Sequence, residues 1–134
     1  MKSKGLFREL ARILGEEGVL WHQEDLMLYA YDALSSLRQP DVAALPRKTE
    51  DVVQIAKLAL RHNLPLVARG AGTGLSGGLV GTECGILLVF SRMKQILEID
   101  LENQRARVQP GVVNLDLSLA VADEGYYYAP DPSS

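Results

Sequence analysis

One glycine-rich stretch sets the organisation of the chain: Arg69-Gly70-Ala71-Gly72-Thr73-Gly74-Leu75-Ser76-Gly77-Gly78-Leu79-Val80-Gly81. It holds half of the chain's 12 glycines. Glycine has no Cβ, so it adopts positive φ freely and lets another group approach the backbone closely. Ordering such a run is entropically unfavourable. The flanking segments, residues 65–68 and 85–90, are apolar and predict two buried strands that would hold the run at both ends.

A loop held in this way can direct successive backbone N–H groups at one anion. Thr73 and Ser76 add hydroxyl donors, and Arg69 adds a positive charge at the entrance. The stretch therefore predicts a cradle for a diphosphate group. The alternative is a flexible connection between two strands that binds nothing.

Two familiar glycine motifs do not fit the stretch. A dinucleotide-binding Rossmann fingerprint must open a helix, but the next regular element here is the apolar, β-branched run at residues 86–90. A P-loop needs Gly-Lys followed by Ser or Thr, and no such sequence closes the run. A dinucleotide would therefore bind a loop between strands, without a helix dipole beneath it.

Composition narrows the class of protein. The chain has 134 residues, enough for one ordinary domain. Its net charge of −3 argues against nucleic acid as a partner. No apolar run approaches the roughly 20 residues of a membrane span, and the first residues lack a secretory h-region. A single cysteine, Cys84, suits a reducing compartment. We expect a cytoplasmic protein without a transmembrane segment.

Periodicity predicts the elements before the glycine stretch. Residues 6–14 have helical spacing, residues 25–32 form a short helix or turn, and residues 41–46 a short strand. Thr49 is the predicted N-cap of the next helix. That helix ends near Asn63, which can adopt the left-handed conformation.

Beyond the second flanking strand, residues 95–100 and 105–109 predict an antiparallel hairpin. A helix then starts at Asn114 or Asp116 and ends at Gly125, and an extended aromatic segment follows. The order strand, helix, strand, glycine loop, strand indicates an α+β fold. Both histidines, and the Cys84 thiol, are interpreted as structural, so the sequence predicts neither a catalytic group nor a metal ligand.

The sequence ends on Tyr126-Tyr127-Tyr128-Ala129-Pro130-Asp131-Pro132-Ser133-Ser134. Aromatic residues and a rigid Pro-Asp-Pro turn are not typical of a frayed polar tail. We therefore expect the polypeptide to stop in the middle of a fold.

Several motifs together carry a resemblance. The glycine stretch, Gln109-Pro110-Gly111-Val112 and Tyr128-Ala129-Pro130-Asp131-Pro132-Ser133-Ser134 resemble the FAD-linked oxidase family with a PCMH-type FAD-binding domain, and within it the flavin subunits of glycolate oxidases. Tyr29-Ala30-Tyr31-Asp32 and Leu45-Pro46-Arg47-Lys48-Thr49-Glu50 also fit. The resemblance covers nearly the whole chain.

The resemblance implies two α+β subdomains with FAD between them. Residues 1–134 would be the N-terminal subdomain and the start of the second. The glycine loop would hold the pyrophosphate, and the C-terminal motif would lie along the flavin. The implied cofactor-binding residues are Arg69, Gly70, Ala71, Gly72, Thr73, Gly74, Leu75, Ser76, Gly77, Gly78, Pro130, Asp131, Pro132 and Ser133.

The resemblance also implies what is absent. Members of the family continue with a second flavin segment and a substrate-capping domain. This chain would therefore be the FAD-binding part of an oxidoreductase that transfers a hydride from a 2-hydroxy acid, such as glycolate or D-lactate, to FAD. The alternative is a non-catalytic nucleotide-binding or assembly module. We expect the fragment to self-associate, and a complete protein to reach the membrane periphery only through other oxidase subunits.

Overall fold

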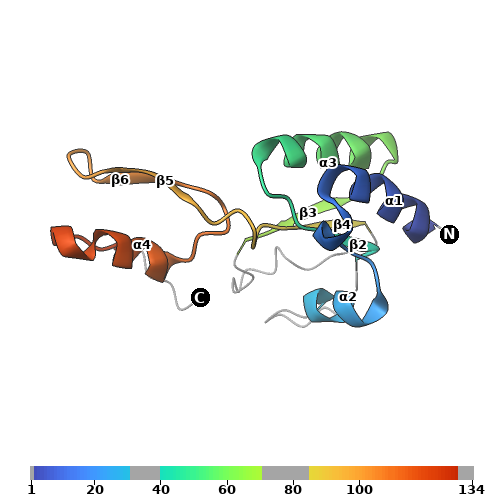
Figure 1. Ribbon diagram of the computed structural model, residues 1–134, viewed down its shortest axis with the longest axis horizontal. Helices are drawn as coiled ribbons and strands as arrows, with labels where there is room; N and C mark the ends of the chain where they lie inside the picture. The colour runs from blue at the N-terminus through green and yellow to red at the C-terminus, as the bar shows by residue number, and fades with distance from the viewer. Residues whose placement is uncertain (1, 31–39, 71–84, 130–134) are drawn as a thin grey trace.

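The computed structural model describes residues 2–30, 40–70 and 85–129, which fold into two parts (Figure 1). Both combine helices with strands, so the expected α+β class is confirmed. The first part contains α1 (Lys2–Leu14), η1 (Glu16–Gly18), β1 (Val19–Leu20), α2 (Gln23–Ala30), β2 (Val42–Ala44), α3 (Thr49–Arg61), β3 (Leu66–Arg69) and β4 (Ile86–Val89). The second contains β5 (Ile96–Asp100), β6 (Arg105–Val108), α4 (Asn114–Val121) and η2 (Ala122–Glu124).

The first part is built on a four-stranded sheet with strand order β1-β2-β4-β3. Strand β4 pairs in parallel with both β2 and β3, whereas β1 pairs with β2 in antiparallel fashion. Ile86 faces Val42 on one side and Leu66 on the other. All four residues of β4 are buried, as expected for an apolar run that lies inside a mostly parallel sheet.

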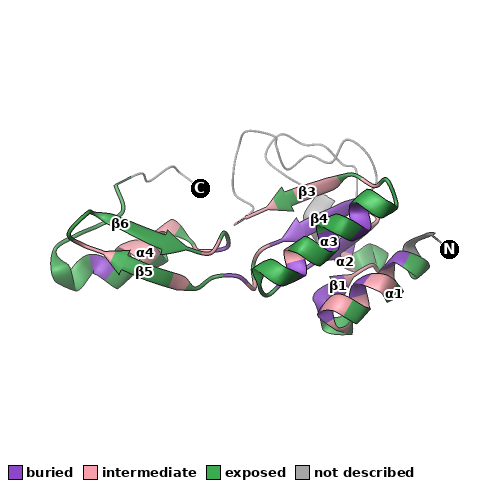
Figure 2. Ribbon diagram, turned by 90° about the horizontal axis from the view of Figure 1, so that it is seen from above, coloured by how far each residue is buried: buried purple, intermediate pink, exposed green. Residues whose placement is uncertain are grey.

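Helices cover both faces of this sheet, with α1 and α3 on one side and α2 on the other (Figure 1). Alternate residues of a strand pack into two separate hydrophobic cores, because successive side chains of a strand point to opposite faces of the sheet. Leu88 packs beneath α1 and α3, and Leu87 packs beneath Leu26 of α2. Figure 2 shows the buried stripe of α3 turned toward the sheet and its exposed stripe turned outward.

The sequence of α1 explains its position. Leu6, Leu10 and Leu14 recur every four residues and are all buried, so they form one apolar face. Burying each leucine contributes about 2 kcal/mol. The predicted helix over residues 6–14 is confirmed, and it begins earlier, at Lys2.

The N-terminus of α3 differs from the sequence prediction. Thr49 is the first helical residue, and the N-cap is Lys48, whose side chain makes no capping hydrogen bond. Asp51 acts instead: it is buried, and its Oδ2 accepts the backbone N–H of Arg47 at 3.0 Å. The prediction of Thr49 as the N-cap is therefore wrong. The carboxylate of Asp51, two residues later, instead accepts a backbone N–H of the segment that enters the helix. The predicted ending is confirmed, with Asn63 at a φ of 53°.

Two strands also depart from expectation. Residues 65–68 were predicted as a buried strand, but β3 is only half-buried and Ala68 is exposed. The reason is topological, since β3 lies at an edge of the sheet. Strand β1 was not predicted, because two residues carry no usable periodicity.

The second part follows the predicted order. β5 and β6 form the expected antiparallel hairpin, with an irregularity between Ile96 and Glu98. Helix α4 begins at Asn114, and Gly125 ends η2 in the left-handed conformation at a φ of 78°. Much of this part is exposed, as Figure 2 shows. Across the described residues of both parts, no helix combines the length and apolarity that crossing a membrane requires.

Candidate functional site

The glycine stretch leaves the sheet at the carboxyl end of β3. Arg69 is the last residue of the strand, and Gly70 follows it. The chain returns at Gly85, directly before the amino end of β4. In open sheets with parallel strands, ligands bind outside the carboxyl ends of the strands. The first residues of the predicted diphosphate cradle therefore lie at the carboxyl end of the parallel strands, where a ligand is expected.

A second motif lies against this point. A Cβ built on Gly70 would lie 3.3 Å from the carbonyl oxygen of Pro110. The backbone N–H of Phe90, which follows β4, donates to the carbonyl oxygen of Arg69 at 3.1 Å. The start of the glycine stretch and the Gln109-Pro110-Gly111-Val112 motif are thus neighbours in space, although the sequence alone does not connect them.

The glycine of this second motif has a steric cause. The N–H of Gly111 donates to the carbonyl oxygen of Met93 at 2.8 Å. A Cβ on Gly111 would overlap the carbonyl oxygen of Phe90 and lie 2.8 Å from that of Met93. Only glycine allows this approach of two backbone segments. Gly111 therefore closes the junction between the two parts of the molecule.

The residue at which the described chain resumes after the glycine stretch has a similar steric constraint. A Cβ on Gly85 would overlap the carbonyl oxygen of Pro65, and that oxygen also accepts the N–H of Ile86 at 2.9 Å. Gly85 is therefore tied to the start of β3. The residues before and after the loop therefore both lie against backbone carbonyls: a Cβ at Gly85 would overlap one, and a Cβ at Gly70 would make a tight contact with another.

Most of the predicted cofactor-binding residues lie outside the described part of the chain. Arg69 and Gly70 are described, and both are half-buried. The other predicted residues lie outside it: Ala71, Gly72, Thr73, Gly74, Leu75, Ser76, Gly77, Gly78, Pro130, Asp131, Pro132 and Ser133. Cys84, interpreted as a structural thiol, also lies outside it.

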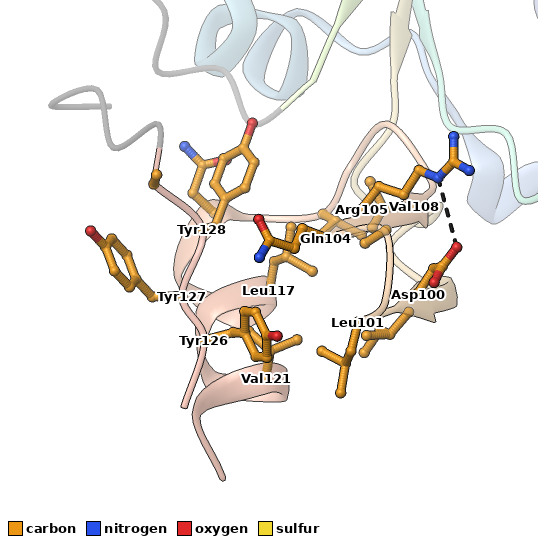
Figure 3. Close-up of a pocket in the computed structure, with 15 residues that line it drawn as sticks. Asp100, Leu101, Gln104, Arg105, Val108, Leu117, Val121, Tyr126, Tyr127 and Tyr128 are labelled. Carbon is orange, nitrogen blue, oxygen red and sulfur yellow. Dashed lines mark ion pairs between the residues drawn. The ribbon is translucent and has the colours of Figure 1, made fainter. Parts of the chain in front are cut away.

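An open groove of about 530 Å³ lies in the second part, between the hairpin and α4 (Figure 3). Its lining is mostly apolar, and sequence reasoning did not identify it. The hairpin contributes Ile99 and Val108, and α4 contributes Leu117 and Val121. Tyr126 lies beside Val121 in Figure 3, whereas Tyr127 points away and is 75% exposed.

One ion pair marks the rim of this groove. Arg105 Nε lies 3.7 Å from Asp100 Oδ2, as the dashed line in Figure 3 indicates. Asn103 donates both its side-chain amide, at 2.8 Å, and its backbone N–H, at 3.2 Å, to the same carboxylate. These Asn103 hydrogen bonds, with a smaller contribution from Arg105, lower the pKa of Asp100. The carboxylate stabilises the tight turn of the hairpin.

The segment before the C-terminal motif returns along α4. The N–H of Tyr126 donates to the carbonyl oxygen of Val121 at 3.3 Å, and that of Tyr128 donates to Ser118 Oγ at 2.9 Å. Ala129, the last described residue, lines the groove. The hydrogen bonds of Tyr126 and Tyr128 therefore set the point from which the Pro-Asp-Pro motif continues.

The histidines have structural surroundings. His62 Nε2 lies 3.1 Å from Glu9 Oε1, which links α3 to α1. His22 packs on Trp21, with ring centroids 4.8 Å apart. Within residues 2–30, 40–70 and 85–129, no cluster of three or more histidine, cysteine or acidic residues could hold a metal ion.

Comparison with known proteins identifies the family. Residues 40–134 match the family model of an FAD binding domain. The chain belongs to this FAD-binding family. It is 42% identical over its full length to the glycolate oxidase subunit GlcD of Bacillus subtilis, and 50% identical over 87% of its length to that of Escherichia coli K12. It spans 29% and 23% of these two relatives.

A solved structure shows the same fold. The chain matches alkyldihydroxyacetonephosphate synthase with a TM-score of 0.82 and 20% sequence identity, over 97% of this chain and 29% of that one. The α+β fold of a PCMH-type domain is therefore established, as the sequence motifs predicted. Membership of the family identifies FAD as the cofactor.

The described residues fit such a cofactor. Gly70 starts its loop at the carboxyl edge of a parallel sheet, and backbone packing at Gly85 and Gly111 fixes the surroundings of that loop. Phosphate oxygens bind well to backbone N–H groups presented by a fixed loop. A side chain at Gly70 would instead crowd the Pro110 carbonyl.

Proposed function

We propose that the chain is the FAD-binding N-terminal part of a glycolate oxidase-like flavoprotein that oxidises a 2-hydroxy acid such as glycolate or D-lactate. One observation carries this proposal: two motifs distant in sequence meet at Gly70 and Pro110, at the carboxyl end of β3. The identity to glycolate oxidase subunits supports the choice of reaction.

The proposed roles divide between two segments. Arg69, Gly70 and the loop to Gly78 would hold the diphosphate of FAD through backbone N–H groups, with hydroxyl donors from Thr73 and Ser76. The motif at residues 130–133 would lie along the flavin end. Residues 1–134 would then form an incomplete PCMH-type domain, whose second flavin segment and substrate-capping domain lie in other sequence.

The chemistry belongs mainly to the cofactor. When bound, the flavin supplies an acceptor for the hydride that leaves the carbon bearing the substrate hydroxyl. The residues of this chain bind and orient the cofactor, and we assign none of them the role of general base. Groups that position the acid substrate would come from the substrate-capping domain.

A second candidate function is a non-catalytic FAD-binding or assembly module. The open apolar groove of the second part favours it for the isolated chain, because a surface of this kind usually contacts another segment or protein. We further propose contact with other oxidase subunits. On the basis of the single cysteine, we place the protein in the cytoplasm. We expect it to reach the membrane periphery only through those subunits.

The flavin content of variants in the glycine stretch tests whether this stretch binds the diphosphate of FAD. In a full-length relative that carries this segment, Gly72→Val or Gly77→Val should lower FAD occupancy sharply, because a branched side chain crowds the phosphates or forbids positive φ. Thr73→Ala should cost only about 1 kcal/mol of binding energy if its hydroxyl makes one ordinary hydrogen bond. Occupancy is read from the visible spectrum of each purified variant.

The matched control is Gly5→Val, because nothing lies within 4 Å of a Cβ at Gly5. It should leave flavin content unchanged. Equal FAD occupancy in Gly72→Val and the parent would mean that the loop is not part of the binding site. Normal FAD content combined with an absence of 2-hydroxy acid turnover in the parent would instead favour the non-catalytic module.

A further inference from the structure

A second groove is lined by residues of α1 and α3. Figure 1 shows these two helices in the part of the molecule that lies away from the hairpin. The groove has a volume of about 510 Å³ and is remote in the fold from the hairpin. Its floor is apolar, with the half-buried Ile13 and the buried Leu58. Nothing in the proposed binding of FAD uses this surface.

The rim of the groove is strongly basic. Arg8 and Arg12 of α1 face Lys57 and Arg61 of α3, and Glu9 is the one acid in the lining. These four cations and one carboxylate stand in contrast to the net charge of −3 of the whole chain. Positive charge is therefore concentrated here on an otherwise acidic protein.

The arrangement of these charges is unfavourable for the isolated chain. Arg8 and Arg12 are four residues apart on one helix, and so are Lys57 and Arg61 on the other. Like charges at this spacing destabilise a helix. Glu9 is already engaged by Arg61 at 2.9 Å and by His62 at 3.1 Å.

Within the part of the chain that the structure describes, the remaining cations of the groove have no acidic partner. Among the described residues, no hydrogen bond or ion pair engages the side chains of Arg8, Arg12 or Lys57. All three are exposed. The groove therefore holds at least three cationic groups that an external anion can neutralise.

Gly5 supplies an independent observation. It lies inside α1 and lines the groove, and an added Cβ would meet nothing within 4 Å. Glycine inside a helix is less stable than alanine, so a glycine with open space around it has no packing reason within this chain. Its effect is to leave the helix backbone accessible at the wall of the groove.

We propose that this groove binds an acidic, amphipathic polypeptide segment of a partner protein. Apolar side chains of the segment would cover Ile13 and Leu58, and its carboxylates would pair with Arg8, Arg12 and Lys57. A nucleic acid fits less well, because it offers no apolar side chain for the floor and would be repelled by the net negative charge of the chain.

The test uses a short fluorescein-labelled peptide in which leucines at helical spacing alternate with glutamates. Fluorescence anisotropy should show saturable binding to the 134-residue chain that weakens as salt is raised. Arg8→Gln combined with Arg12→Gln should weaken binding about tenfold or more, since paired charges on a partly apolar surface are lost. Lys94→Gln combined with Arg107→Gln removes the same charge elsewhere and should change affinity less than about twofold.

Gly5→Gln separates binding from folding. Glutamine has the higher helix propensity, so the melting temperature should rise, while its side chain should occupy the groove and weaken peptide binding. Amide NMR shifts on adding peptide to the unmodified chain should cluster in α1 and α3. Equal loss of affinity in the two double variants, or shifts elsewhere, would overturn the proposal. So would tighter binding of the groove to a single-stranded oligonucleotide than to the peptide.

Discussion

At the scale of single residues, the glycines of this chain have different structural roles. Gly70, Gly85 and Gly111 sit where another backbone segment approaches closely, and each would bring a Cβ against a carbonyl oxygen. Gly125 is needed for its positive φ, and Gly5 has open space around it. The same residue type therefore predicts opposite outcomes of substitution at different positions.

Gly111→Ala should destabilise the chain by about 3 kcal/mol or more, because the atoms that the new methyl group meets belong to backbone and cannot move aside cheaply. Gly5→Ala should stabilise it by about 0.5–1 kcal/mol. Urea unfolding followed by circular dichroism measures both. A destabilisation at Gly111 no larger than that of an average surface change would mean that the junction of Phe90, Met93 and Gly111 is wrongly described.

At the scale of elements, one carboxylate in the middle of α1 joins that helix to the C-terminal end of α3. Glu9 accepts from Arg61 and lies within hydrogen-bond distance of His62. The His62 side chain is the largest cause that lowers the pKa of Glu9, and Arg61 adds to it. The link ties together the two helices that cover one face of the sheet.

This lowered pKa has a consequence for stability. A carboxylate whose pKa is lower in the folded state stabilises the fold above its ordinary pKa, and the contribution is lost as the pH falls through the folded value. The pair is partly exposed, so Glu9→Gln should cost only about 0.5 kcal/mol at neutral pH. Unfolding free energies of the two proteins should converge as the solution is acidified below the ordinary glutamate pKa. A difference that stays constant with pH would mean that the link is not ionic.

The sequence predicts the secondary-structure elements better than it predicts their tertiary contacts. The four-residue spacing of Leu6, Leu10 and Leu14 and the apolar run of β4 fix those elements locally, so both were predicted. The exposure of β3 depends on its place at the sheet edge, which no local pattern records. The meeting of Gly70 with Pro110 was likewise missed, because it follows from the folding of the whole chain.

The candidate site was predicted through motifs and not through geometry. Family membership confirms FAD as the cofactor. All the individual binding residues, at positions 69–78 and 130–133, remain predictions. The basic groove between α1 and α3 gave no signal in the sequence, because Arg8 and Arg12 become neighbours of Lys57 only when the helices pack.

At the scale of the whole molecule, the second part has little core of its own. It consists of a two-stranded hairpin and α4 with η2, and a two-stranded hairpin is marginally stable in water. Leu115 and Leu119 of α4 are both 64% exposed. Exposed apolar surface of this kind favours association.

We therefore expect the 134-residue chain to form dimers and to bind FAD weakly. Replacing Leu115 and Leu119 with glutamine should shift sedimentation toward the monomer. Leu60→Gln, on the outer surface of α3 and 82% exposed in the parent, should not. A monodisperse monomer with submicromolar FAD affinity would contradict both expectations, because the cofactor cleft would then be complete within this chain.

The strand order has a further consequence, for biosynthesis. β4 is central in the sheet, yet it is the last of the four strands in sequence. A ribosome adding about 5–20 residues per second therefore releases the apolar faces of α1 and α3 roughly one to fifteen seconds before the strand that organises them is available. Nascent chains stalled before β4 has left the ribosome should be captured by chaperones and cut readily by protease, and chains stalled well after it should resist. We therefore expect the N-terminal half to need chaperones until β4, the last of the four strands in sequence, completes the sheet.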